Sequence, residues 1–163
     1  MDEIVIRGVY PEDLDRITEI EAICFPPAEA AQREAFQERI AAFPESFLVA
    51  EAAGMLIGFI NGCATNSAFI YDELFHSTEH HIATGQNLAV FGLDVLPAYR
   101  RQGVAARLML HFIQTARKSG RSSIILTCKE RLVPYYESFG YVNNGISQSV
   151  HGGSQWYDMT LIL

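Results

Sequence analysis

The sequence has few cysteines and no excess of positive charge. Its three cysteines, Cys24, Cys63 and Cys128, are odd in number, widely separated and surrounded by apolar residues. This pattern argues against a disulfide framework and favours buried thiols in a reducing compartment. Acidic residues outnumber basic ones by 19 to 12, which gives a formal net charge of -7. Because nucleic acid is bound by a basic face, we expect no nucleic-acid partner, and a cationic substrate suits this charge better.

Long apolar runs, linkers and repeats are also absent. No apolar run reaches the length of a membrane span, and the first residues, MDEIVIRG, lack the basic start and apolar block of a secretory signal. We therefore expect a cytoplasmic protein without a membrane partner, either a monomer or a homodimer. No Pro/Ser-rich linker or internal repeat interrupts residues 1–163, which we expect to form a single domain.

Apolar periodicity predicts alternating strands and helices. Leu14, Ile17, Ile20 and Ile23 repeat at helical spacing, whereas residues 87–97, NLAVFGLDVLP, form a near-continuous apolar run typical of a buried central strand. Residues 67–86 indicate a loop with a helical turn. The predicted strands are 3–9, 46–53, 55–65, 87–97, 121–128, 141–150 and 154–163, and the predicted helices are 11–25, 28–43, 104–120 and 130–139. This order favours an α/β (α+β) fold with a mixed, mostly antiparallel sheet of about seven strands and helices on both faces.

One junction between strand and helix concentrates cations. Residues 97–109, PAYRRQGVAARLM, place two arginines and a glycine directly before a long helical pattern. The first N–H groups of a helix lack internal partners and point outward at the positive end of the helix dipole, so they form a natural anion site. Gly103 removes a Cβ that would keep a ligand from the backbone, and Ala105 keeps the next turn small. A pyrophosphate fits this turn, although an ordinary surface helix start has the same pattern.

This turn resembles the signature of the GNAT superfamily of acyl-CoA-dependent N-acetyltransferases. In that signature an Arg or Gln, two residues, a Gly, one residue and a Gly or Ala open the long helix after the central strand, as Arg100, Gly103 and Ala105 do here. The segment LVPYYESFGY, residues 132–141, resembles a second signature, a short helix with a tyrosine near the thioester sulfur. The resemblance implies the GNAT fold, acetyl-CoA as co-substrate and no metal.

The resemblance also assigns residues to the cofactor. Leu93, Asp94 and Val95 are expected to splay from the neighbouring strand and to offer backbone groups to the pantetheine arm. Tyr136 is expected near the thioester sulfur. The turn assigned to the pyrophosphate comprises Arg100, Arg101, Gln102, Gly103, Val104, Ala105 and Ala106.

Three segments look like arylalkylamine (serotonin-type) N-acetyltransferases: CFPP at 24–27, FPESFLVAEAAGMLIGFINGC at 43–63 and CKERLVPYYESFGY at 128–141. The resemblance implies a small primary amine as acceptor, with an aromatic amine as one option. Those enzymes place two histidines, one residue apart, on the central strand as a proton relay. The matching positions here are Ala89 and Phe91. Other members use a glutamate on this strand, which Ala89 cannot replace, so the base stays unassigned.

Acetyl transfer requires a neutral amine nitrogen, so a base or an ordered water must accept a proton from the acceptor. Asp94 is conspicuous as a carboxylate in an apolar strand, which usually indicates a partnered or functional group, unless alternation turns it to an edge. Tyr136, chosen by the family alignment, is expected to protonate the leaving thiolate, since a phenol stays protonated at neutral pH. Tyr135 is expected to pack. The candidate bases are Asp72, Glu73, His76, Glu79, His80, His81 and Asp94.

Two other classes of function are consistent with parts of the sequence. Residues 76–80, HSTEH, spell the H-x-x-E-H pattern of certain zinc peptidases through His76, Glu79 and His80. The missing base also allows a non-catalytic CoA-binding module. We expect direct transfer to the amine in a ternary complex. A covalent route through Cys128 lacks an evident histidine partner.

Overall fold

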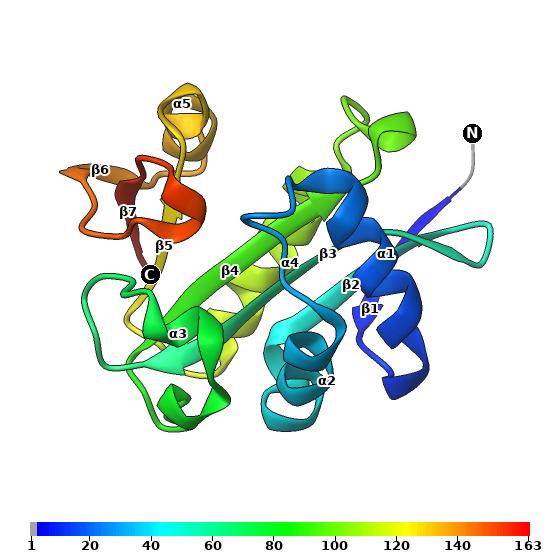
Figure 1. Ribbon diagram of the computed structural model, residues 1–163, viewed down its shortest axis with the longest axis horizontal. Helices are drawn as coiled ribbons and strands as arrows, with labels where there is room; N and C mark the ends of the chain where they lie inside the picture. The colour runs from blue at the N-terminus through cyan, green and yellow to red at the C-terminus, as the bar shows by residue number, and fades with distance from the viewer. Residues whose placement is uncertain (1–2) are drawn as a thin grey trace.

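The computed structural model describes residues 3–163, through which one seven-stranded sheet runs (Figure 1). The strand order is β1-β2-β3-β4-β5-β7-β6, and every neighbouring pair is antiparallel except β4 and β5. The predicted mixed, mostly antiparallel sheet is thereby confirmed. The strands are β1 (Ile4–Gly8), β2 (Phe47–Ala52), β3 (Met55–Thr65), β4 (Asn87–Val95), β5 (Ser123–Cys128), β6 (Val142–Ile146) and β7 (Tyr157–Ile162).

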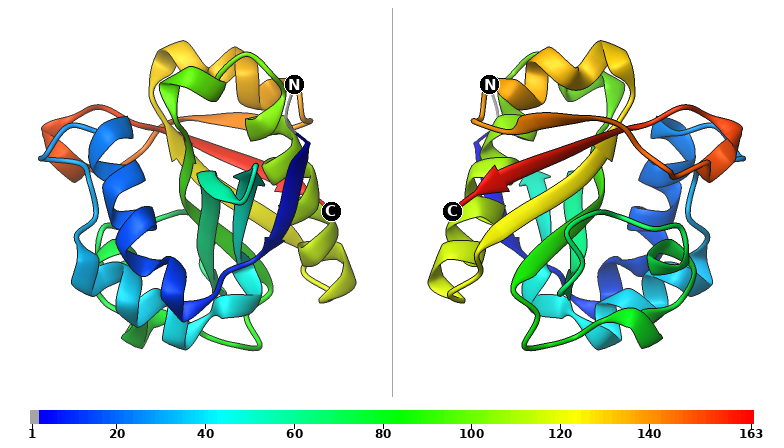
Figure 2. Two further views of the ribbon diagram at one scale, coloured as in Figure 1. Left: turned by 90° about the vertical axis from the view of Figure 1, so that its right-hand side faces the viewer. Right: turned by 90° about the vertical axis from the view of Figure 1, so that its left-hand side faces the viewer.

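Helices cover both faces of the sheet. The helices α1 (Leu14–Cys24) and α2 (Arg33–Ala42) lie on one face and α4 (Val104–Lys118) on the other, as the two side views show (Figure 2). In α4, Val104, Leu108, Phe112 and Ala116 are buried at intervals of four residues, so one stripe of the helix packs on the sheet. The short helices are α3 (Glu73–His76) and α5 (Val133–Glu137). None of the helices in residues 3–163 is long and apolar enough to cross a membrane.

Two predicted elements are shorter in the structure. The predicted helix 28–43 begins only at Arg33, because the amides of Glu29 and Ala30 donate to the carbonyl of Pro26 in a turn. The predicted strand 141–150 ends at Ile146. Beyond it, the Ser149 hydroxyl donates to Asp72, which draws the chain away from the sheet. The loop 67–86 contains α3 and a 3₁₀ turn at Thr78–His80, as the predicted loop with a helical turn requires.

A β-bulge interrupts the pairing of β3 with β4. Asn61 pairs with Gly92 and Gly62 pairs with Val90, so Phe91 is the extra residue on β4. The two strands approach so closely here that a Cβ on Gly62 would overlap the carbonyl oxygen of Ala89. Bulges are common beside active sites, where they redirect side chains. The glycine at position 62 therefore permits the geometry of β4 around Phe91.

The parallel pairing of β4 with β5 is brief. It covers three residue pairs, from Asn87 with Ser123 to Ala89 with Ile125. Beyond Ala89 the two strands diverge, and neither forms further ladder pairs with the other along Val90–Val95 or Leu126–Cys128. The expected splay of the central strand is present and begins at Val90, three residues before Leu93.

Substitution of Gly62 by alanine should destabilise the protein, because the new methyl group would push β3 and β4 apart at the bulge. Overpacking of this kind costs about 1–3 kcal/mol. Urea unfolding measures the loss. Gly8→Ala is the matched control, since Gly8 lies in edge strand β1 and a Cβ added there would meet nothing within 4 Å. Equal stabilities of the two variants would contradict the close approach.

Candidate functional site

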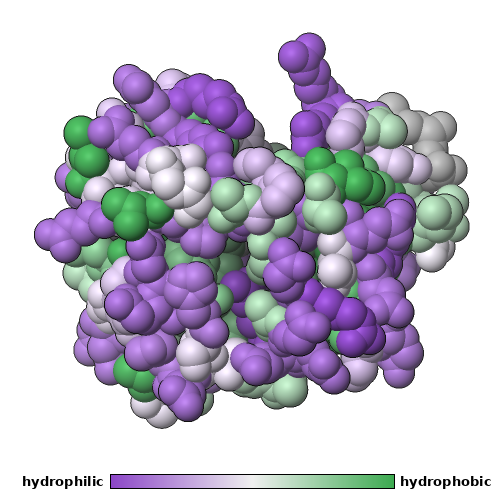
Figure 3. Space-filling view, in the orientation of Figure 1, coloured by the Kyte–Doolittle hydropathy of each residue, from purple (hydrophilic) through white to green (hydrophobic). Residues whose placement is uncertain are grey.

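The divergence of β4 and β5 opens a cavity of about 190 Å³, which we call the β4–β5 cavity. Its walls come from both strands and from the segments that face them. In the space-filling view, the surface is hollowed near the centre of the face that carries α1, α2 and α3 (Figure 3). The lining residues are Glu21, Cys24, Phe25, Pro26, Glu29, Phe75, Val90, Phe91, Gly92, Leu93, Leu126, Thr127, Cys128, Lys129, Arg131, Leu132, Tyr136, His151 and Trp156.

The turn that precedes α4 presents a row of free amides. Within residues 3–163, the backbone N–H groups of residues 101–106 donate to no protein acceptor, and the first helical bond runs from the Arg107 amide to the Gly103 carbonyl. We call these six groups the amide row. Gly103 has φ +81°, a left-handed conformation that favours glycine, and a Cβ there would meet nothing within 4 Å. The amide row therefore faces open space at the positive end of the helix dipole.

The predicted cofactor residues occupy different environments. Leu93 lines the β4–β5 cavity, whereas the Val104 side chain is buried beneath α4 and only its amide belongs to the amide row. Arg100 points back toward the sheet, because its Nε donates to the Val95 carbonyl at 2.9 Å. The Cys24 thiol donates to the same carbonyl at 3.4 Å. Arg100 thus ties the turn to the end of β4, and the Val95 carbonyl already has protein partners.

Tyr136 lies in the wall of the β4–β5 cavity and is 9% exposed. Its ring packs edge-to-face against Tyr135 and Tyr141. Burial raises the pKa of the Tyr136 hydroxyl well above its ordinary value, so the phenol is protonated at neutral pH and can donate a proton. Burial also raises the pKa of the neighbouring Cys128 thiol to about 11, which keeps this sulfur from being a good nucleophile.

Two buried carboxyl groups face each other beside the cavity. Asp94 is 1% exposed, Glu21 is 7% exposed, and a Cβ added at Gly92 would lie 3.1 Å from Oδ1 of Asp94 and 3.8 Å from Oε1 of Glu21. Both oxygens of Asp94 and Oε1 of Glu21 have no hydrogen-bond donor within the described chain. Burial, followed by the charge of Glu21 and a hydrogen bond to it, raises the pKa of Asp94 well above its ordinary value. Asp94 is therefore the member of the pair that holds a proton.

A buried guanidinium compensates the charge of this pair. Arg39 on α2 is 5% exposed and donates to the Asn61 side chain and to the Phe75 carbonyl, each at 3.1 Å. Its guanidinium also lies 4.6 Å from the centre of the Phe91 ring. Burial lowers the pKa of Arg39 to about 10, against the opposing effect of the Glu21 charge, so Arg39 stays cationic at neutral pH. The position that matches a relay histidine thus holds a phenylalanine that packs on Arg39.

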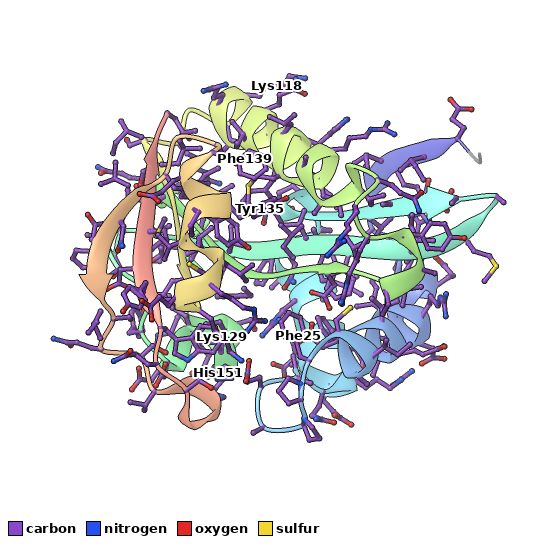
Figure 4. All side chains as sticks on the ribbon, turned by 90° about the horizontal axis from the view of Figure 1, so that it is seen from above. Phe25, Lys118, Lys129, Tyr135, Phe139 and His151 are labelled. Carbon is purple, nitrogen blue, oxygen red and sulfur yellow. The ribbon has the colours of Figure 1, made fainter. Side chains whose placement is uncertain are left out.

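An ion pair links the two sides of the cavity. Lys129, just beyond β5, donates to Glu29 at 2.9 Å. Seen from above, Phe25 and Lys129 lie on opposite sides of the gap between α1 and β5, with His151 beside Lys129 (Figure 4). The His151 ring stacks on Phe75 with 4.8 Å between ring centres. Aromatic rings and one ion pair therefore surround the opening.

The candidate bases in loop 67–86 lie in several places. The Asp72 carboxylate accepts hydrogen bonds from Ser149 and Val150, and His81 accepts one from the Ala64 amide at 3.1 Å. Burial lowers the pKa of His81. His80 packs against Tyr71. Of the remaining three, Glu73, His76 and Glu79, only His76 lines a second cavity, which adjoins the β4–β5 cavity.

The HSTEH segment does not form the helix that a zinc peptidase motif requires. His76 ends α3 and His80 ends a separate 3₁₀ turn, because Ser77 between them is extended. Among the described residues, no group of three or more His, Cys, Asp or Glu side chains is arranged to hold a metal ion. The alternative of a zinc site through His76, Glu79 and His80 therefore has no support in the described part of the chain.

Glu21 and Arg39 are site residues that the sequence reasoning missed. The predicted apolar stripe of the first helix ran through Ile23, which is 51% exposed, whereas Glu21 is buried. Leu14, Ile17 and Ile20 are buried as predicted, but the buried face continues through Glu21 to the half-buried Cys24 instead of Ile23. A carboxylate at a position with core spacing was the available signal.

Known proteins share parts of this sequence and this fold. The chain is similar to probable hydrolase YhcX of Bacillus subtilis (strain 168), with 30% identity over 146 residues that cover 84% of this chain and 28% of that protein. The chain therefore spans less than a third of the length of this curated relative.

The fold is similar to two structures of CoA-bound proteins. One is the GNAT-like decarboxylase GphF in complex with isobutyryl-CoA, with a TM-score of 0.84, 19% identity and coverage of 97% of this chain and 98% of that one. The other is Arabidopsis thaliana Naa50 in complex with the bisubstrate analogue CoA-Ac-MVNAL, with a TM-score of 0.75, 18% identity and coverage of 97% of each chain. The acetyltransferase (GNAT) family model matches residues 14–141, and the chain belongs to this family.

Proposed function

We propose that the protein transfers the acetyl group of acetyl-CoA to the nitrogen of a small primary amine, by direct attack in a ternary complex. The observation that carries this proposal is the position of the amide row and the β4–β5 cavity at the same end of β4. An anion site and an apolar slot placed in this way suit a pyrophosphate with a thioester arm. Membership of the acetyltransferase (GNAT) family supports the same reading.

The cofactor would contact the turn and the strand that the sequence indicated. The amide row would donate to the pyrophosphate, and Arg101, which is exposed, would add a screened charge. The backbone of β4 from Val90 to Leu93 lines the cavity and has no ladder partner on β5, so it would be available to the pantetheine arm. The Asp94 and Val95 side chains are buried away from it, so their predicted contribution would come from the backbone alone.

Tyr136 would act as the acid of the reaction. Bound acetyl-CoA would supply the acetyl group as an activated thioester. Backbone N–H groups of β4 near the Phe91 bulge would donate to the thioester oxygen as it gains negative charge. The raised pKa of Tyr136 suits a group that must hold its proton until the thiolate leaves. Cys128 would stay a neutral thiol, which favours direct transfer over a covalent route.

The walls of the cavity favour an amine with an apolar body. Phe25, Phe75, Phe91 and Trp156 supply aromatic surface, while Glu21 and Glu29 supply carboxylates. Aromatic faces and carboxylates both attract an ammonium group attached to a hydrophobic side chain. An arylalkylamine, the acceptor class of the enzymes that three segments of the sequence resemble, has this chemistry.

A thiol-release assay tests the proposed function. Acetyl-CoA should release CoA only in the presence of an accepted amine, and arylalkylamines should exceed amino acids and aminoglycosides in a panel of acceptors. CoA should also stabilise the fold by about 2.7 kcal/mol at a concentration of about 100 times its Kd, measured by thermal unfolding. Stabilisation by CoA with no acetylation of any amine would identify a CoA-binding module, and release without amine would identify a hydrolase.

Gly103→Val should weaken CoA binding by at least about tenfold, because its side chain disfavours the left-handed backbone and enters the space in front of the amide row. Calorimetric titration with CoA measures the affinity. Gly54→Val is the matched control, since Gly54 has φ +78° and an equally open Cβ position in the β2–β3 turn. Gly54→Val should lower the stability of the protein and leave its affinity for CoA unchanged. Arg101→Ala should lose at most about fivefold in affinity. An unchanged Kd for Gly103→Val would place the pyrophosphate elsewhere.

Tyr136→Phe should lower kcat by at least about tenfold while CoA affinity stays within about threefold, because the ring is kept and only the proton donor is removed. Single-turnover rates with a verified amine measure the effect on chemistry. Tyr135→Phe serves as the control, since Tyr135 does not line the β4–β5 cavity. Equal rates for Tyr136→Phe and the parent protein would exclude Tyr136 as the acid.

A further inference from the structure

We propose that Glu21 is the catalytic base that accepts the proton of the acceptor amine, and that Asp94 is the residue that positions it. This inference rests on the proposed acetyl transfer. It supplies the base that neither the central strand nor loop 67–86 provides at the cavity. Glu21 is distinguished by its position, by its unpartnered oxygen and by the charges around it.

Glu21 lies at the junction of two cavities. The β4–β5 cavity adjoins a second cavity of about 300 Å³, which we call the α2-side cavity. The α2-side cavity is bounded by the segment 28–32, Arg39 and His76. Both cavities are lined by Glu21 and by the ring of Phe91. An acceptor in the α2-side cavity and a thioester in the β4–β5 cavity would therefore meet next to Glu21.

One oxygen of Glu21 is fixed and the other is free. Oε2 accepts the amide hydrogen of Ala31 at 2.8 Å, which anchors the carboxylate to the segment 28–32. Oε1 is buried and receives no hydrogen bond from residues 3–163. A buried carboxylate oxygen without a donor is unfavourable, and a ligand N–H relieves this penalty. The free oxygen thus has the property required of a proton acceptor.

The neighbouring groups favour a proton acceptor at Glu21. Asp94 holds a proton, so it does not repel the Glu21 carboxylate. Its hydrogen can occupy one lone pair of that carboxylate, while another lone pair of Oε1 stays available to a ligand. Arg39 supplies a fixed cation that the fold has already desolvated. Asp94 is therefore the member of the pair that holds a proton, and Glu21 is the member that reaches the two cavities.

Other titratable groups on the shared wall are already engaged. Glu29 is paired with Lys129 at 2.9 Å, and Nε2 of His151 lies 2.9 Å from the Glu29 carbonyl. Of the two cavities, His76 lines only the α2-side cavity. Among the carboxylates that line both cavities, Glu21 thus has a buried oxygen that accepts no hydrogen bond from residues 3–163.

The proton balance is simple. The acceptor ammonium loses two protons. Glu21 takes the first and passes it to solvent, and the neutral nitrogen then forms the new bond to the acetyl carbon. As the carbon–sulfur bond breaks, the nitrogen loses its second proton to Glu21 and the sulfur takes a proton from Tyr136. Transfer of that second proton through solvent to Tyr136 restores both residues, so each turnover releases one proton. Neither step requires a metal or an oxidant.

Glu21→Gln tests the proposal. Glutamine keeps an oxygen for the Ala31 amide but cannot accept a proton, so kcat/KM should fall by at least about a hundredfold at about pH 7. CoA affinity should stay within about threefold. Glu19→Gln is the matched control, because it makes the same substitution on the same helix. The Glu19 side chain is exposed and forms an ion pair with Arg16. Glu19→Gln should match the parent protein.

The pH dependence separates a base from a structural role. In Glu21→Gln, the solvent must supply neutral amine, so the loss should shrink by at least about tenfold between about pH 7 and about pH 9. A structural defect would give the same ratio of parent to variant kcat/KM at both pH values. The other titratable groups that line the two cavities or lie beside Glu21 are present in both proteins; they are Cys24, Glu29, Arg39, His76, Asp94, Lys129, Tyr136 and His151. Of these, Cys24, Arg39 and Asp94 lose in Glu21→Gln the neighbouring charge that raises their pKa values.

Asp94→Asn and chemical rescue complete the test. Asp94→Asn should alter the pH profile of kcat/KM, because it removes a titratable neighbour of Glu21. It should lower the plateau by less than Glu21→Gln, because the asparagine amide can still donate to Glu21 and the base is kept. Formate should raise the activity of Glu21→Ala by at least about tenfold. A rate for Glu21→Gln within about threefold of the parent, or an equal loss at both pH values, would overturn the inference. A parent protein that acetylates no amine would overturn the proposed function itself.

Discussion

The divergence of β4 from β5 is the constraint on which the rest of the site depends. A parallel ladder of three pairs holds the strands together up to Ala89, after which each strand has a partner on one side only. The freed edges would expose backbone polar groups to an apolar interior, at a cost unless a ligand or water pairs with them. The unpaired edges lie where β4 and β5 diverge, and the β4–β5 cavity, Tyr136 and the Glu21–Asp94 pair lie at the same place.

A second cost is the burial of charge on the α1–α2 side of the sheet. Replacing one member of a buried ion cluster usually destabilises a protein, because the remaining charge is left without a partner. Arg39 is held by Asn61, by the Phe75 carbonyl and by two aromatic faces. These contacts fix the cation in place, whereas Oε1 of Glu21 has no donor among the described residues. A buried cation with several partners beside a carboxylate oxygen without a donor is typical of a ligand-binding site.

The sequence predicted the strands and most of the helices, because their apolar periods are long and regular. It also predicted the free turn at Gly103, since a glycine and small residues at a helix start have a direct steric meaning. It did not predict Glu21, because the apolar residues flanking this carboxylate indicated a core stripe through Ile23. The burial of Glu21 instead of Ile23 depends on tertiary contacts, because Arg39 on α2 and Asp94 on the distant strand β4 come to the same face as Glu21.

The bulge at Phe91 determines on which face of the sheet each residue of β4 lies. Side chains of a strand alternate, so one inserted residue exchanges the two faces for everything that follows. Leu88 and Val90 face the α4 core, yet Leu93 and Val95 pack in that same core, five residues after Leu88 and Val90 respectively. Asp94 is thereby placed against Glu21 instead of beneath α4. The extra residue in β4 thus determines which side chain of that strand faces Glu21. Deletion of one residue at the bulge would turn Asp94 to the other face of the sheet and separate the two carboxyl groups.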